Sequence, residues 1–281
     1  VDWDVNSDVM KHHQKSYVGN DMISKQTERL FGKPTDFKEF VYYSQLTQAK
    51  AVSIAVSSHR TNYPECMGTL YWQVNDCWQA PTWSSIDYAG KWKILQYQVQ
   101  KDYQDLTVLE RVEELGKENY YLISDAFKKD SIRLNCQVLS LDGKFLNAID
   151  TVMVPSNKGD LIVSSAFLDA YRDAGFVLSF NWNKIGKGES YSRIFSSLGE
   201  NHKKAVRDSF NLILIGVDEK SQQMQFVLDN KDFMKDVWFT TAVEGAFFED
   251  NVLDLVPGQH LVTVKYKDLP LKAEDIEVFW R

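Results

Sequence analysis

The apolar positions in the first third of the chain recur at helical spacing. A first helix capped by Asn20 or Asp21 is expected to end at Gly32-Lys33-Pro34, where a glycine and a proline follow the last apolar turn. A capping-box pattern at 36–39 then predicts a long helix over roughly 37–59.

A short, largely apolar run follows these helices. Residues 67–74 lie between Pro64 and the polar pair Asn75-Asp76, and their composition predicts a buried strand. Apolar side chains return to helical spacing from Trp92 onward, which predicts another helix. The order helix, strand, helix with an apolar strand is typical of an α/β unit with a parallel sheet.

Beyond about residue 105 the pattern alternates with period two. Apolar and polar residues alternate strictly over 132–138, Asp142-Gly143 supplies a hairpin turn, and 148–152 can form the return strand. Further short alternating runs continue to the end of the sequence. Their spacing predicts two antiparallel, immunoglobulin-like sandwiches, one over 106–198 and the other over 205–281.

Composition narrows the classes of function. The 281 residues are 44% hydrophobic and 25% charged, as in ordinary globular domains. A net charge of -7 argues against nucleic acid or an anionic membrane as the main partner. No apolar run is long enough to predict a membrane span.

The start at Val1, without a methionine or a leader pattern, suggests a processed or cut chain and indicates no localisation.

Three cysteines leave two interpretations open. Cys66 and Cys77 are close enough in sequence to pair in an oxidising compartment, whereas Cys136 would remain unpaired. Alternatively, all three are small buried hydrophobic residues.

Aromatic residues mark the segment with the clearest functional signal. Aromatic content is 13%, and four of the eight tryptophans fall within 72–92. Tryptophan faces stack on the C–H faces of sugars, while amide and carboxylate groups bind hydroxyls. Trp72 and Trp78 beside Asn75 and Asp76 therefore suit a saccharide subsite. The alternative is an aromatic wedge between packed domains.

The same segment carries three motifs that resemble one enzyme family. They are Leu70-Tyr71-Trp72-Gln73-Val74-Asn75-Asp76-Cys77-Trp78, then Trp83-Ser84-Ser85-Ile86-Asp87-Tyr88, then Gly90-Lys91-Trp92-Lys93. Together they are similar to the last barrel strand and helix of β-mannosidases in glycoside hydrolase family 2. The resemblance covers essentially the whole chain and is strongest over 36–103.

The resemblance implies a mixed fold and a sugar substrate. Residues 1–105 would form the C-terminal portion of a (β/α)8 barrel whose last strand is 67–74, followed by the two sandwiches. The family hydrolyses terminal β-mannose residues with retention of configuration, so a β-mannoside is the implied partner. His13 falls where the family's loop after strand 7 approaches the active-site mouth, which makes it a further candidate for substrate binding.

The catalytic motifs of the family are missing from these residues. The family places its acid/base glutamate in an Asn-Glu pair and its nucleophile in a Ser-Glu-Phe/Tyr-Gly motif, and neither occurs in the sequence. Both glutamates are therefore expected upstream of Val1, and no catalytic residue is assigned within the chain. No cofactor is expected, and no metal site either, because His12-His13 has no ligand at suitable spacing.

Two alternative functions belong to other classes. The two sandwiches could form a stand-alone carbohydrate-binding or scaffolding module. The chain could also be part of another family 2 glycosidase, a β-galactosidase or β-glucuronidase, which the run Gln73-Val74-Asn75-Asp76 disfavours.

Overall fold

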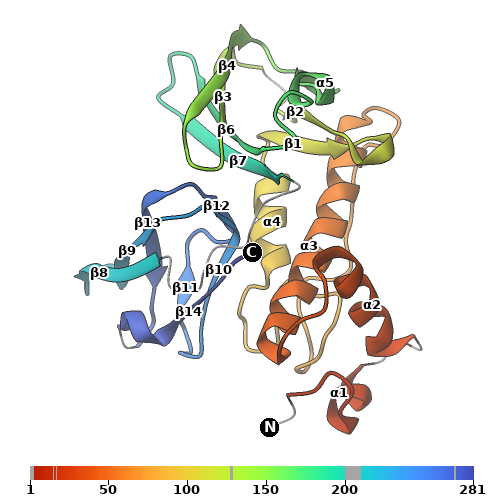
Figure 1. The fold of residues 1–281 in the computed structure, drawn as a ribbon, viewed down its shortest axis with the longest axis vertical. Coiled ribbons are helices and arrows are strands. Elements are labelled where there is room, and N and C mark those ends of the chain that lie inside the picture. Colours follow the sequence, from red (N-terminus) through yellow and green to blue (C-terminus); the bar gives the residue numbers. More distant parts are fainter. Residues whose placement is uncertain (1–2, 15, 17, 127–128, 200–209, 269) are drawn as a thin grey trace. The chain divides into compact units, whose positions relative to one another are not determined.

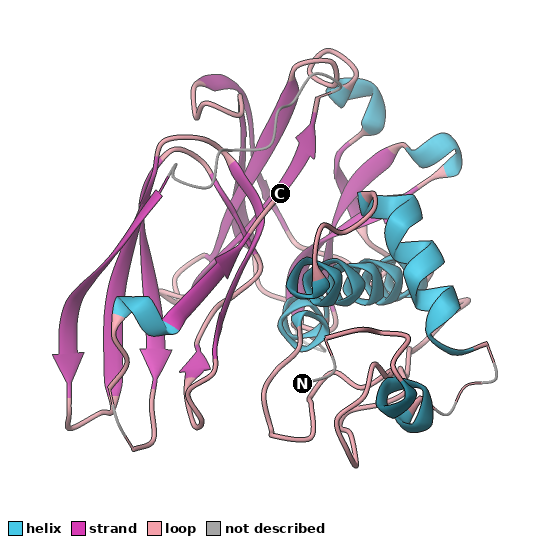
Figure 2. Ribbon diagram, turned by 60° about the horizontal axis from the view of Figure 1, so that its bottom comes forward, coloured by secondary structure: helices cyan, strands magenta, loops and turns pink. Residues whose placement is uncertain are grey.

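The computed structural model describes the whole chain except residues 1–2, 15, 17, 127–128, 200–209 and 269. The chain divides into two compact units. One comprises 1–59 and 68–103, and the other comprises 60–67 and 104–281. The first unit is helical and the second is built almost entirely of strands (Figure 1 and Figure 2). Within the described ranges, no helix has the length and apolar character that crossing a membrane requires.

In its described residues, the first unit has four helices: α1 (Asp8–His13), α2 (Gly19–Phe31), α3 (Phe37–Thr61) and α4 (Ile94–Asp102). Helix α2 begins one or two residues before the expected cap and ends, as predicted, at Gly32, whose φ of 82° suits a residue without a side chain. At the start of α3 the Glu39 amide donates to the Asp36 carboxylate at 2.8 Å. The Glu39 carboxylate in turn accepts from the amide of Thr35, one residue earlier than a standard capping box.

Helices α3 and α4 lie side by side (Figure 1). The Gln98 amide donates to the Ser53 hydroxyl at 3.1 Å, and Gln45 accepts from the backbone amide of Ile94 at 3.0 Å. The second bond satisfies one of the amides that the first turn of a helix leaves without an internal partner. Buried aliphatic and aromatic side chains fill the space between the helices: Tyr42, Leu46, Val56, Ile94, Leu95 and Val99.

The segment 67–74 differs from its expected state. Its residues form no ladder strand, and the bridges nearby are single ones, Asn75 with Ile86 and Ile86 with Trp92. Leu70 is fully exposed. A strand is defined by pairing with neighbours, and the described part of this unit offers the segment no parallel strand to pair with. In its described residues this unit therefore has helices but not the barrel strand expected over 67–74.

The first sandwich of the second unit has a three-stranded and a four-stranded sheet, in the orders β1-β2-β5 and β4-β3-β6-β7. The elements are β1 (Leu106–Val112), η1 (Glu114–Gly116), β2 (Glu118–Ser124), β3 (Ile132–Leu139), β4 (Phe145–Met153), β5 (Asp160–Val163), α5 (Ser165–Leu168), β6 (Gly175–Lys184) and β7 (Ser190–Leu198). On β3 the alternating residues Ile132, Leu134, Cys136 and Val138 are fully buried, as the sequence pattern predicted. They pack into one core with Phe176, Leu178, Phe180 and Trp182 of β6.

The second sandwich has sheets in the orders β12-β10-β14 and β11-β13-β9-β8. The elements are β8 (Phe210–Asp218), β9 (Gln223–Asn230), β10 (Met234–Thr241), β11 (Phe247–Phe248), β12 (Leu253–Leu255), β13 (Gly258–Lys265), η2 (Ala273–Asp275) and β14 (Ile276–Phe279). Met224, Phe226 and Leu228 of β9 point into a separate core. The two sandwiches therefore bury their apolar residues in two different clusters and share no sheet. No disulfide links Cys66, Cys77 or Cys136, all of which lie in the described ranges.

Candidate functional site

The aromatic segment identified from the sequence folds back on itself as a loop over 72–93. Backbone hydrogen bonds close it at its base: the Ser85 amide donates to the Gln73 carbonyl at 3.0 Å, and the Ile86 amide donates to the Val74 carbonyl at 2.7 Å. The Lys93 amide then donates to the Ser85 carbonyl at 2.9 Å, immediately before α4 begins. These bonds fix the loop against the start of a buried helix.

Four polar side chains of this loop, Asp76, Thr82, Ser84 and Lys93, form a largely buried cluster. The Lys93 ammonium lies 2.9 Å from Oδ2 of Asp76 and 2.7 Å from the Ser84 hydroxyl. The Ser84 hydroxyl donates to the same carboxylate oxygen at 2.5 Å, and the Thr82 hydroxyl donates to the other oxygen. The side chains of Asp76 and Lys93 are 3% and 13% exposed, so the pair is largely removed from water.

The partners of Asp76 decide its charge state. Burial raises the pKa of the Asp76 carboxyl, but hydrogen bonds from Ser84, Thr82 and Lys93, together with the Lys93 charge, outweigh it. The net result is a pKa below the ordinary value. Asp76 is therefore ionised at neutral pH, and its lone pairs are directed toward three protein donors.

Other residues of the loop expose aromatic and amide groups to solvent. The side chain of Trp72 is 75% exposed and that of Trp83 is 53% exposed. Asn75 is also exposed. An indole that is mostly exposed offers a surface for stacking. The neighbouring Asn75 amide offers both a hydrogen-bond donor and an acceptor.

Trp78 has a different environment, because His13 covers one of its faces. The two ring centroids are 4.7 Å apart and the planes are inclined by 6°. Nδ1 of His13 lies 2.6 Å from the Gln79 carbonyl oxygen. A carbonyl oxygen only accepts, so Nδ1 carries the proton. In the neutral ring Nε2 is then an acceptor, suited to a hydroxyl.

The structure places the five candidate residues in three different environments. His13 and Trp78, 65 positions apart, are in direct contact. Asp76, in contrast, faces the buried cluster, while Trp72 and Asn75 lie on the exposed part of the loop. Lys93, which no sequence pattern marked as functional, is central to the buried cluster. The signal for it in the sequence is its place in the Gly-x-Trp-Lys motif.

Within the described residues, no group of three or more histidine, cysteine, aspartate or glutamate side chains is placed to hold a metal ion. Independently of any metal, the exposed groups of the loop include the indoles of Trp72 and Trp83 and the amide of Asn75. Such groups stack on and hydrogen-bond to a polyhydroxylated ligand.

Comparisons with curated proteins point to one enzyme. No protein-family model matches the chain. The chain is 40% identical over 109 residues to a β-mannosidase of Bos taurus and 34% identical over 160 residues to β-mannosidase A of Aspergillus oryzae. These alignments cover 34% and 52% of the chain, but only 12% and 18% of the relatives. They confirm the resemblance to β-mannosidases over part of the sequence.

Solved structures extend the likeness to nearly the whole fold. A crystal structure of a β-D-mannosidase from Dictyoglomus thermophilum superposes with a TM-score of 0.72 and 19% identity, covering 96% of this chain and 33% of that one. An exo-chitosanase from Amycolatopsis orientalis superposes with a TM-score of 0.67 and 14% identity, covering 98% of this chain and 38% of the other. At these identities the superpositions establish the fold alone.

Proposed function

We propose that this chain is the C-terminal part of a retaining exo-β-mannosidase of glycoside hydrolase family 2. Residues 1–105 would complete a (β/α)8 barrel through the segment 67–74, and 106–198 and 205–281 would be its two trailing sandwich domains. The observation that carries the proposal is the loop over 72–93, whose exposed Trp72 belongs to the motif shared with β-mannosidases. Curated relatives of at least 31% identity favour mannose over the amino sugar of the structurally similar exo-chitosanase.

In this role Trp72 is the stacking surface for the C–H face of the terminal sugar. Asn75 binds hydroxyls at the edge of the ring. Trp78, held against His13, forms the second aromatic wall, and Nε2 of His13 accepts from a hydroxyl. Asp76 acts differently: its ion pair with Lys93 holds the loop in place, so it supports the sugar-binding side chains from below.

The chain binds and positions the sugar in this proposal, but does not cleave it. Retaining hydrolysis needs two carboxyl groups ~5–5.5 Å apart, one as nucleophile and one as acid/base. The two glutamate motifs of the family are absent from the 281 residues, so both carboxyl groups come from other residues of the enzyme.

The test compares the chain with the enzyme of which it would form part. The isolated chain is expected to release no chromophore from p-nitrophenyl β-mannoside. The complete enzyme is expected to hydrolyse this substrate with retention of the β configuration, which proton NMR of the first-formed sugar reports. Turnover by the isolated chain would contradict the assignment of its residues. Preference of the complete enzyme for a β-galactoside or β-glucuronide would contradict the substrate.

A further inference from the structure

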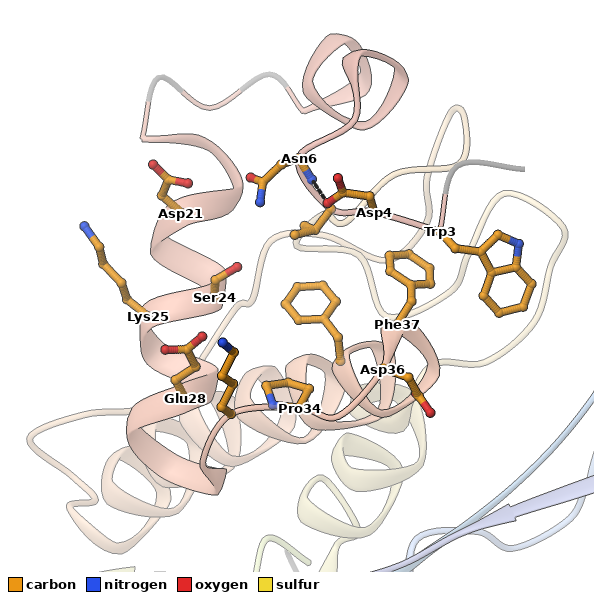
Figure 3. Close-up of a pocket in the computed structure, with 13 residues that line it drawn as sticks. Trp3, Asp4, Asn6, Asp21, Ser24, Lys25, Glu28, Pro34, Asp36 and Phe37 are labelled. Carbon is orange, nitrogen blue, oxygen red and sulfur yellow. Dashed lines mark hydrogen bonds between the residues drawn. The ribbon is translucent and has the colours of Figure 1, made fainter.

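A hollow in the helical unit is lined by none of the residues of the aromatic loop over 72–93. It has a volume of about 450 Å³ and lies between the segment 3–6, helix α2 and the start of α3 (Figure 3). This volume is within the range of sites that bind small ligands. The hollow contains none of the five residues that the sequence analysis selected as candidate sugar-binding residues.

Aromatic rings line one side of the hollow. Trp3 meets Phe37 edge to face at a centroid distance of 6.0 Å, and Phe37 stacks with Phe40 at 6.1 Å. Phe40 is buried, whereas Trp3 is 54% exposed. Figure 3 shows the Phe37 ring and Trp3 at the side opposite α2. The Lys38 ammonium lies over the Trp3 ring, 5.8 Å from its centroid, so the exposed indole is covered on one face and open to solvent elsewhere.

The opposite side is a polar row along one face of α2. Asp21, Ser24, Lys25 and Glu28 lie at helical spacing and line the hollow (Figure 3). The complete lining contains four acids, Asp4, Asp21, Glu28 and Asp36, against the two lysines Lys25 and Lys33. Carboxylates accept hydrogen bonds from hydroxyls, and the excess of acids repels an anionic sugar.

We propose that this hollow, which we call the α2 pocket, binds one ring of a neutral saccharide. An aromatic wall facing a rim of donors and acceptors matches the two kinds of surface that a sugar ring presents. The two lysines offset two of the four acids, which weakens the attraction of the rim for a polycation. The choice of mannose as the sugar rests on the proposed function, whereas the site itself rests on the geometry of this unit.

The α2 pocket is connected to the aromatic loop through shared hydrogen bonds. Asn20 of α2, which is 5% exposed, donates to the carbonyl of Val5 at 2.6 Å. The Gln14 amide donates both to Asn20 at 3.0 Å and to the carbonyl of Pro81 in the loop at 2.9 Å. The two sites are thus held by one scaffold. A saccharide long enough to occupy both would bind more tightly than either site alone allows.

The experiment titrates the 281-residue chain with β-1,4-mannohexaose and follows binding by calorimetry and by ligand-observed NMR. Trp3→Ala removes the exposed wall of the α2 pocket, and Ser24→Trp fills the pocket from the α2 side. Each is expected to weaken binding at the pocket at least tenfold. Trp72→Ala tests the contribution of the loop separately. Leu261→Ala, at an exposed position of β13, is the matched control that should leave binding unchanged. Circular dichroism checks that each variant is folded.

Three results would overturn the proposal. They are no binding at millimolar saccharide, binding that both pocket variants leave unchanged, and binding that only Trp72→Ala removes. The last result would still agree with the proposed function, so the two failures are distinguishable. Stronger binding of a glucosamine hexamer than of the mannohexaose would show that the pocket is a cation site. If cellohexaose binds as tightly and depends on Trp3, the saccharide site stands and the choice of mannose fails.

Discussion

The Asp76 carboxylate and the Lys93 ammonium form a buried ion pair, 2.9 Å apart, between the two ends of the aromatic loop. Asp76 lies where the loop leaves the extended segment, and Lys93 is the residue that precedes α4. The pair therefore fixes the span of a loop whose exposed residues are the candidate sugar ligands. Its two hydroxyl partners, from Thr82 and Ser84, come from the middle of the same loop.

Replacing Lys93 is expected to destabilise the helical unit strongly. In Lys93→Met the Asp76 charge stays buried with only hydroxyl donors, and breaking a buried ion pair costs about 3–5 kcal/mol. Urea unfolding followed by tryptophan fluorescence measures the loss, and amide exchange over 72–93 locates it. Lys117→Met is the matched control, because that lysine forms a surface pair with Asp169 in which both side chains are about half exposed. The control should leave the urea midpoint unchanged, and equal effects of the two variants would refute the role of Lys93.

Stability should also depend on pH through Asp76. Its pKa in the folded chain lies below the ordinary value of 3.8, so the unfolded chain binds the proton more readily. The contribution of Asp76 is therefore complete well above pH 3.8 and is lost as the pH falls below 3.8 through the folded-state pKa. The free energy of unfolding of the wild type should exceed that of Asp76→Asn at pH 7, and the difference should shrink toward pH 3. A constant difference over this range would show that Asp76 does not titrate as inferred.

The sequence predicted the elements whose pattern is local. The long helix was expected over 37–59 and spans Phe37–Thr61, and the alternating run over 132–138 became β3. Both predictions are correct because a helix or strand that buries one face repeats its apolar residues with the period of that element. The segment 67–74 shows the limit of this reasoning: its apolar composition predicted a strand, but a strand also needs partners, which no local pattern supplies.

The candidate site shows the same limit. Trp72 and Asn75, predicted as sugar-binding residues from their chemistry, are exposed. Asp76 was chosen on the same grounds but faces Lys93, a contact between residues 17 positions apart in the sequence. The stack of His13 on Trp78 spans 65 positions. Neither contact has a spacing rule, so both required the fold.

Cysteine reactivity should separate the buried thiol from the exposed one. Burial raises the pKa of Cys136 to about 12, so at pH 8 only about one thiol in ten thousand is the reactive thiolate. Cys77 is exposed. Brief treatment of the folded chain with iodoacetamide at pH 8 should modify Cys77 and spare Cys136, as read by peptide mass spectrometry. In urea both should react. Modification of Cys136 in the folded chain would mean that the core of the first sandwich opens readily.

The last prediction concerns Trp72, for which two roles lead to different measurements. If Trp72 were a core residue, Trp72→Ala would cost about 3–5 kcal/mol of stability. Its side chain is 75% exposed in this chain, so the expected loss here is below about 0.5 kcal/mol. Trp182→Ala is the comparison, because Trp182 is 2% exposed within the first sandwich and should show the full core penalty.

In the complete enzyme that the proposed function implies, the same substitution should act on catalysis. Losing the stacking surface is expected to lower kcat/KM for a β-mannoside roughly ten- to a hundredfold, at ~1.4 kcal/mol per factor of ten. Melting temperature and kinetics are measured on the same preparation, so that a loss of folded enzyme is not mistaken for a loss of binding. An unchanged kcat/KM in a folded Trp72→Ala enzyme would refute the stacking role. Trp78, whose ring stacks on that of His13, would then be the next indole to replace.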